Sequence, residues 1–129
     1  MHLHGELLKA KSSVDDNLIY PWSEDIKLGD HCEKGSQLRP HVVWFGEAVP
    51  LLEQAIPIIQ QADAVMVVGT SMQVYPAASL IHYKAKSVPI YFIDPNPQID
   101  ANSTTLIYAE KASTGVPKAI EDLKNNLLD

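Results

Sequence analysis

The pattern of apolar and polar positions changes near residue 41. Residues 9–40 are mostly polar and rich in turn-forming residues, which predicts a small irregular lobe. Its expected packing group is Leu18, Ile19, Tyr20 and Trp22. After residue 41, short β-branched runs alternate with stretches whose apolar residues recur every three or four positions. This change predicts three segments along the chain: residues 1–8, 9–40 and 41–129.

The alternation in residues 41–129 predicts the fold class. Strands are expected at residues 41–45, 64–68, 89–93 and 105–108, and helices at residues 48–62, 75–86 and 116–128. Pro57 is expected to kink the first of these helices or to start a new one. Strands that alternate with helices form a parallel sheet. We therefore expect an α/β fold, a partial doubly wound, Rossmann-like sheet with helices on both faces, beside the small irregular lobe.

Two turns in this part have the chemistry of a ligand site. Residues 65–78 predict a buried strand, a sharp turn at Gly69, and the hydroxyls of Thr70 and Ser71 at the start of a helix. Residues 94–97, Asp-Pro-Asn-Pro, predict a rigid loop after the next strand, where an acidic residue often binds a ribose. Both turns follow the carboxyl ends of predicted strands, and ligands of parallel sheets bind at these ends. The signal is unspecific by itself, because most strand–turn–helix units bind nothing and the chain has no G-x-G-x-x-G loop.

Composition narrows the class of protein. The 129 residues suffice for one modest domain, and 46% of them are hydrophobic, so a core is expected. The net charge of −6 argues against nucleic-acid binding. No run is long enough to span a membrane, and residues 1–11 lack the apolar stretch of a signal peptide. A single cysteine predicts a reducing compartment, the cytoplasm.

The candidate metal ligands are sparse. His2 and His4 have a spacing that suits either a metal ion or an edge strand with alternating side chains. Cys32 has no partner at C-x-x-C distance, because Gly35 occupies that position. A structural zinc site needs four ligands, so no metal is expected.

Three motifs together resemble one family, the sirtuins, which are NAD-dependent protein deacylases. LRPHVVWFGE at residues 38–47 resembles the sirtuin signature LRP-x-V-V-F-F-G-E, and VGTSMQVYPAA at residues 68–78 resembles V-G-T-S-L-x-V-x-P-A-A. Leu3-His4-Gly5 matches the leucine–histidine–glycine motif of the family. The motifs stand in the family's order, and the resemblance covers the C-terminal part of a sirtuin catalytic core.

The resemblance implies a role for individual residues. His4 matches the general base that deprotonates a ribose hydroxyl of NAD, a task that suits imidazole. The implied cofactor-binding residues are Gly69, Thr70, Ser71, Asp94, Pro95, Asn96 and Ala112. The residues implied to bind an acyl-lysine protein or peptide, which adds as an extra strand, are Val43, Phe45, Gly46, Glu47 and, in the acyl channel, Val74. The family commonly has asparagine where Asp94 stands.

The chain departs from the family in two ways. Sirtuins usually carry a four-cysteine zinc ribbon, but Ser12, Asp15 and Gly35 stand near the expected ligand positions and leave Cys32 alone, so no zinc is expected. The glycine-rich phosphate loop of the family's N-terminal half is also missing. We therefore expect a truncated deacylase (deacetylase) that is inactive alone. Its missing half would come from another chain or be replaced by homodimerisation; the alternative is a non-catalytic nucleotide- or peptide-binding or oligomerisation module.

Overall fold

The structure of the protein is a computed structural model, and it describes residues 1–128. The chain divides into two compact units, Met1–Leu51 and Leu52–Asp129. No helix within residues 1–128 combines the length and the apolarity needed to cross a membrane.

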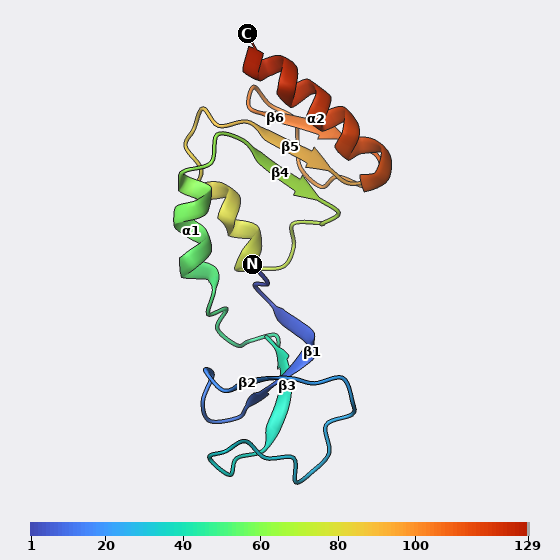
Figure 1. The fold of residues 1–129 in the computed structure, drawn as a ribbon. Coiled ribbons are helices and arrows are strands. Elements are labelled where there is room, and N and C mark those ends of the chain that lie inside the picture. The colour runs from blue at the N-terminus through green and yellow to red at the C-terminus, as the bar shows by residue number, and fades with distance from the viewer. Residues whose placement is uncertain (129) are drawn as a thin grey trace. The chain divides into compact units, whose positions relative to one another are not determined.

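The first unit contains an antiparallel sheet of three strands. Strand β1 (Gly5–Ser12) lies in the centre and pairs with β2 (Ile19–Pro21) on one side and β3 (Leu38–Val42) on the other (Figure 1). The pairing of β1 with β3 is irregular between Gly5 and Ala10. The lobe that was expected to be irregular therefore contains a three-stranded sheet. Its few buried apolar residues come from segments far apart in the sequence, so no local apolar pattern indicated the strands.

A small core holds this sheet against its long connecting segments. Ala10, Cys32 and Leu38 are buried, and the residues packed against them are Leu18, Tyr20, Trp22 and Ile26. Three members of the predicted packing group are therefore confirmed. The prediction for the fourth, Ile19, is wrong. Its side chain is 41% exposed, because the adjacent Tyr20 packs against the core and successive residues of a strand point to opposite faces.

The predicted strand at residues 41–45 is wrong in its position and in its sheet. The strand β3 ends at Val42 and pairs antiparallel with β1 in the first unit, so it does not belong to the parallel sheet. Trp44 to Glu47 form a turn, in which the Glu47 amide donates to the Trp44 carbonyl at 3.1 Å. Gly46 permits this turn with a φ of +89°.

The second unit contains the predicted parallel sheet. Its three strands are β4 (Val65–Val68), β5 (Ile90–Ile93) and β6 (Thr105–Tyr108), in that order. The strands predicted at these positions are confirmed. All four residues of β5 are buried, as expected for a central strand with both faces covered.

Helices cover both faces of this sheet, which confirms the predicted fold class. On one face, Ile59 of α1 (Leu52–Gln60) and Ile81 of the 3₁₀-helix η1 (Ala77–Tyr83) pack against a cluster that contains Phe92. On the other face, α2 (Ala112–Leu128) packs Ala119 against Tyr91 and Ile93 of β5 (Figure 1). Successive β5 residues face opposite sides of the sheet, so each face has its own core.

The predicted helices differ from the observed ones at their ends. The helix expected at residues 75–86 is the shorter 3₁₀-helix η1, in which the Ser79 amide and hydroxyl both donate to the Pro76 carbonyl, at 3.0 and 2.6 Å. Bonds of this i to i+3 kind favour 3₁₀ over α geometry. The helix α1 begins only at Leu52 and continues through Pro57 without a new start, whereas α2 begins earlier than predicted.

Candidate functional site

His4 lies in a turn that is held against the end of β3. The His4 carbonyl accepts a hydrogen bond from the Val43 amide at 3.0 Å, and the next residue, Gly5, pairs with Val42. Gly5 has a φ of +89°, and a Cβ atom at this position would lie 2.0 Å from the His41 carbonyl oxygen. Only glycine fits there. The backbone that carries the exposed His4 imidazole is therefore fixed by the neighbouring strand.

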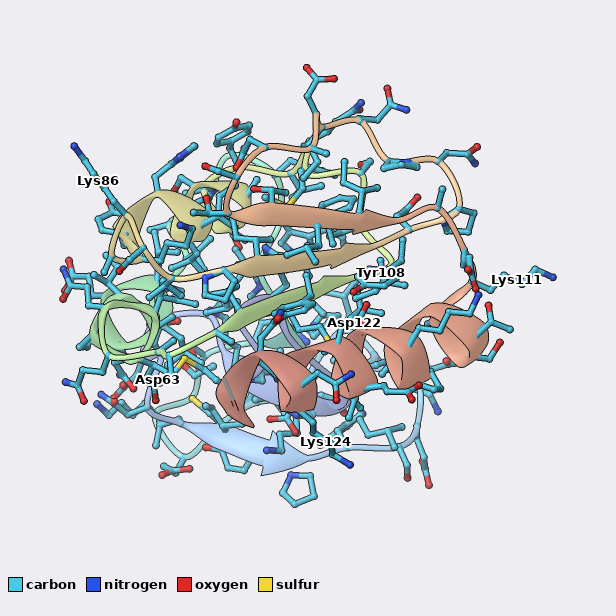
Figure 2. All side chains as sticks on the ribbon, turned by 90° about the horizontal axis from the view of Figure 1, so that it is seen from above. Asp63, Lys86, Tyr108, Lys111, Asp122 and Lys124 are labelled. Carbon is cyan, nitrogen blue, oxygen red and sulfur yellow. The ribbon has the colours of Figure 1, made fainter. Side chains whose placement is uncertain are left out.

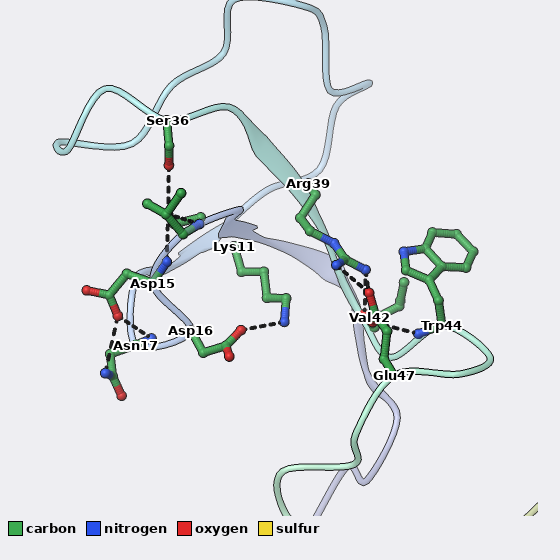
Figure 3. Close-up of polar contacts among 11 residues, drawn as sticks. Lys11, Asp15, Asp16, Asn17, Ser36, Arg39, Val42, Trp44 and Glu47 are labelled. Atoms are coloured by element: carbon green, nitrogen blue, oxygen red, sulfur yellow. Dashed lines mark hydrogen bonds and ion pairs between the residues drawn. The ribbon is translucent and has the colours of Figure 1, made fainter.

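The loop after β3 carries the other predicted residues of the first unit. Its Glu47 carboxylate receives two hydrogen bonds from Arg39 and one from the Trp44 amide (Figure 3). The Arg39 guanidinium, followed by the Trp44 amide, lowers the pKa of Glu47 from its usual range to about 2. Phe45 is 95% exposed at the tip of the turn. The structure thus places Val43, Phe45, Gly46 and Glu47 in one short loop, and Val43 is hydrogen-bonded to the turn that carries His4.

The strand β3 lies at an edge of its sheet. Within residues 1–128, the sheet order β2-β1-β3 leaves one side of β3 without a neighbouring strand. An extended peptide can add to such an edge through main-chain hydrogen bonds. In the described part of the chain, the free edge of β3 therefore has unpaired backbone groups to which an extended peptide could add.

In the second unit, two of the predicted turns meet at the carboxyl edge of the sheet. Val68 pairs with Ile93 at the ends of β4 and β5, and the Gly69 amide donates to the Ile93 carbonyl at 2.9 Å. Gly69 has a φ of +63°, and no atom lies within 4 Å of the position that its Cβ would take. Beyond Gly69, the exposed Ser71 lies at this open edge.

The polar groups at this edge are partly ordered by the chain itself. The Thr70 hydroxyl accepts a hydrogen bond from the Met72 amide at 3.1 Å, and the half-buried Asp94 accepts one from the Asn96 amide at 2.8 Å. One carboxylate oxygen of Asp94 is thus engaged by its own loop, while the other is suited to a ribose hydroxyl. Pro95 between them is exposed.

The remaining predicted positions of this unit also lie outside its core. Ala112 is the exposed first residue of α2, which follows β6 and begins near the same carboxyl edge. Val74 is 45% exposed and lies between the Gly69 turn and η1. Taken together, the edge fits the ribose and base of a nucleotide, because it offers hydroxyls, a carboxylate and free backbone. It does not include a glycine-rich phosphate cradle.

One hollow of the second unit lies elsewhere. It has a volume of about 390 Å³ and is lined by Ile90 and Thr105, the first residues of β5 and β6. This is the amino end of the sheet, and no predicted site residue lines it. Ligands of parallel sheets bind at the opposite end, so the carboxyl edge stays the candidate ligand site of this unit.

The surroundings of Cys32 do not fit a zinc ion. Its sulfur lies 3.1 Å from the Ser36 hydroxyl and 3.4 Å from the Ser12 hydroxyl, which are 2.9 Å from each other. Hydrogen bonding with the hydroxyl of Ser12, and then with that of Ser36, lowers the pKa of the Cys32 thiol to about 7. Among residues 1–128, no group of three histidine, cysteine or acidic side chains is placed to hold a metal ion. Serine hydroxyls are not among the ligands that structural zinc sites use.

Sequence reasoning gave no role to Arg39, which the structure places in the loop site. Arg39 lies within the quoted LRP motif, eight positions before its partner Glu47. The available signal was a charge at each end of a strand–turn segment that contains Gly46. This signal is weak, because two opposite charges pair across a turn only when the strand ends at a position that brings their side chains together.

Comparison with known proteins agrees with this geometry. The profile of the Sir2 family matches residues 1–76. An NAD-dependent protein deacylase of Helicobacter pylori is 56% identical over 95 residues, which make up 74% of this chain and 42% of that protein. One of Bacteroides thetaiotaomicron is 40% identical over 134 residues, covering 99% of this chain and 56% of that protein.

Solved structures show the same likeness. The crystal structure of a Sir2 homologue–NAD complex matches with a TM-score of 0.76 and 30% identity, over 98% of this chain and 51% of that one. Sir2Tm bound to a propionylated peptide matches with a TM-score of 0.70 and 26% identity, over 93% of this chain and 54% of that one.

The fold is that of an α/β protein with a parallel sheet and a separate small antiparallel sheet. Together with the profile match, this fold shows that the chain belongs to the Sir2 family. The chain spans about half the length of the curated relatives it matches, 42% in one case and 56% in another.

Proposed function

We propose that this chain forms the part of an NAD-dependent protein lysine deacylase that carries the general base, the peptide-binding edge and part of the nucleotide site. The observation that carries the proposal is the position of His4, whose carbonyl is hydrogen-bonded to Val43 at the end of an edge strand. A general base has to be held beside the bound substrate, and this contact fixes the backbone of His4 relative to the end of β3, where the peptide would bind.

The peptide would bind at β3 and the loop that follows it. In this proposal Val43 and Gly46 pair with the main chain of the peptide, Phe45 contacts its side chains, and Val74 lines the acyl channel. The 95% exposure of Phe45 supports this role, because an aromatic ring without partners in the chain gains contact area when a ligand covers it.

The nucleotide would bind at the carboxyl edge of the parallel sheet. Gly69, Thr70 and Ser71 would contact NAD, Asp94 and Asn96 would hold its adenosine ribose beside Pro95, and Ala112 would touch the adenine. When bound, NAD supplies the ribose that accepts the acyl group. His4 would take a proton from a hydroxyl of that ribose, which makes the oxygen a nucleophile.

The peptide part of the proposal is tested by binding. The purified chain should bind an acetyl-lysine peptide more tightly than the same peptide with unmodified lysine, and Phe45→Ala should weaken that binding. The exposed residue Leu28, which is 100% exposed on the same unit, provides the control Leu28→Ala. Equal affinity for the two peptides would contradict the proposal.

We further propose that the 129-residue chain by itself turns over NAD poorly. The sequence has no glycine-rich loop that could bind the pyrophosphate, so the nucleotide would be held at one end only. Robust NAD-dependent deacylation by the purified 129-residue chain would contradict this proposal.

The outer edge of β4 supports a proposal about partners. Within residues 1–128, the order β4-β5-β6 leaves β4 with a neighbour on one side only. A strand from a complementing N-terminal half, or from a second copy of the chain, would satisfy its backbone groups. Light scattering that shows only monomers, together with no binding of the N-terminal half of a relative, would contradict this proposal.

We also propose that the first unit needs no metal and that the protein acts in the cytoplasm. The serine neighbours of Cys32 and the presence of one cysteine support these two points. Metal analysis of the purified protein should find no stoichiometric zinc, and one zinc per chain would contradict the first point.

A further inference from the structure

The Glu47 carboxylate is tied to two different parts of the first unit. Arg39 Nη1 donates to Oε1 at 2.6 Å and Arg39 Nη2 to Oε2 at 3.1 Å, while the Trp44 amide donates to Oε2 at 2.9 Å (Figure 3). Arg39 is on β3, whereas Trp44 begins the turn. Paired hydrogen bonds between a guanidinium and a carboxylate fix direction as well as distance. Glu47 therefore connects the turn to the strand.

The same turn is closed a second time by its backbone. The Glu47 amide donates to the Trp44 carbonyl at 3.1 Å, so Trp44 and Glu47 are joined in both directions. Arg39 Nη2 also donates to the Val42 carbonyl at 3.4 Å. Phe45, at 95% exposure, has almost no packing that could set its position. Its position is therefore set by these polar contacts.

We propose that Arg39 and Glu47 are positioning residues that hold residues 43–47 in the conformation that receives the acyl-lysine peptide. This inference rests on the proposed function and changes the role of Glu47. Both oxygens of its carboxylate are engaged within the chain, so Glu47 acts through the loop and not by touching the peptide. A loop ordered in advance loses less entropy on binding, which strengthens the complex.

Conservative variants separate the charge of the Arg39–Glu47 pair from its geometry and from the hydrogen bond to the Trp44 amide. Glu47→Gln keeps an oxygen that can accept from the Trp44 amide but removes the charge, and Arg39→Lys keeps the charge but removes the paired geometry. Glu47→Ala removes every side-chain contact and leaves the backbone hydrogen bond to Trp44. We expect peptide affinity to fall about tenfold in Glu47→Ala and by a smaller factor in the two conservative variants. The control is Asp16→Asn, which breaks the 2.6 Å ion pair with Lys11 in the same unit and should leave peptide affinity unchanged.

A second readout reports the loop without any peptide. Hydrogen exchange of the Trp44 amide should accelerate in Glu47→Ala, because this amide loses its acceptor, while the amides of β1 and β3 stay protected. If Glu47→Ala unfolds the unit, the peptide affinities of Glu47→Gln and Arg39→Lys provide the test in a folded chain.

The outcomes separate this inference from the proposed function. Faster Trp44 exchange together with weaker peptide binding supports the positioning role. Peptide binding that is the same in Glu47→Gln, Arg39→Lys and the unsubstituted chain, while Phe45→Ala loses it, would overturn the inference and leave the proposed function standing. No preference of the unsubstituted chain for the acylated peptide would overturn both.

Discussion

The backbone at Gly5 lies against the neighbouring strand so closely that it leaves no room for a side chain. We predict that Gly5→Ala destabilises the first unit by about 3 kcal/mol, because the new methyl group overlaps a backbone carbonyl and the φ of +89° is unfavourable for alanine. The matched control is Gly35→Ala, whose φ of +74° is also positive but whose Cβ would meet nothing within 4 Å. It should cost about 1–2 kcal/mol.

Denaturant unfolding followed by tryptophan fluorescence measures both variants, since Trp22 and Trp44 both lie in the first unit. Equal losses in Gly5→Ala and Gly35→Ala would show that the close approach to His41 has no energetic weight, and would contradict the account of how His4 is held.

Cys32 offers a prediction about pH. Its pKa is lowered from 9.0 to about 7, so its thiolate stabilises the folded state. That contribution is fully present above the pKa of the unfolded chain and is lost as the pH falls through about 7. We expect the ultraviolet absorbance of the thiolate to titrate near pH 7, and Ser36→Ala to raise the midpoint. Ser13→Ala, at an exposed neighbouring serine, is the control. An unchanged midpoint in Ser36→Ala would contradict the role of the hydroxyl.

The residue scale also shows what a sequence can and cannot indicate. Gly69 was expected to make a sharp turn, whereas Gly5 was matched only as part of a motif and its close contact with β3 was not predicted. The pairing of Arg39 with Glu47 was not predicted, because it depends on where β3 ends and how sharply the chain turns at Gly46. Neither is determined by the spacing of apolar residues.

At the scale of elements, the contact between α2 and the sheet is unusually close at Gly115. A Cβ atom there would lie 2.6 Å from Cγ2 of Ile93, which is fully buried. Alanine is a better helix former by about 1 kcal/mol, but overpacking a rigid β-branched side chain costs about 1–3 kcal/mol. We predict that Gly115→Ala lowers the free energy of unfolding by about 1 kcal/mol.

Circular dichroism during chemical unfolding measures this change. Lys124→Ala is the control, because Lys124 lies on the same helix and points away from the sheet (Figure 2). It should be neutral or slightly stabilising. A stabilising effect of Gly115→Ala would contradict the close helix–sheet contact.

Two further contacts attach α2 to the sheet. The Tyr108 hydroxyl donates to Asp122 at 2.6 Å (Figure 2), and Asn126 donates to the Tyr91 hydroxyl at 3.1 Å.

The sequence predicted helix α2 and strands β4, β5 and β6, because short β-branched runs and a long amphipathic stretch are distinctive. It failed for β3, since the apolar run at residues 42–45 continues past the strand into a turn.

At the scale of the whole chain, the two units divide the proposed function between them. In that proposal the first would carry the general base and the peptide edge, and the second would carry the nucleotide edge. The motifs identified the family from the sequence. The antiparallel sheet of the first unit was not predicted, because its strands are joined by long polar segments and share a core of few residues.

The most direct test of this account is an NMR titration of the purified chain with NAD, following the backbone amides. We predict that shifts concentrate at the carboxyl edge of the parallel sheet, at Gly69, Thr70, Ser71, Asp94 and Asn96. No shift at these amides even at millimolar NAD, or shifts confined to Ile90 and Thr105 at the amino end, would contradict the nucleotide edge on which the proposed function depends.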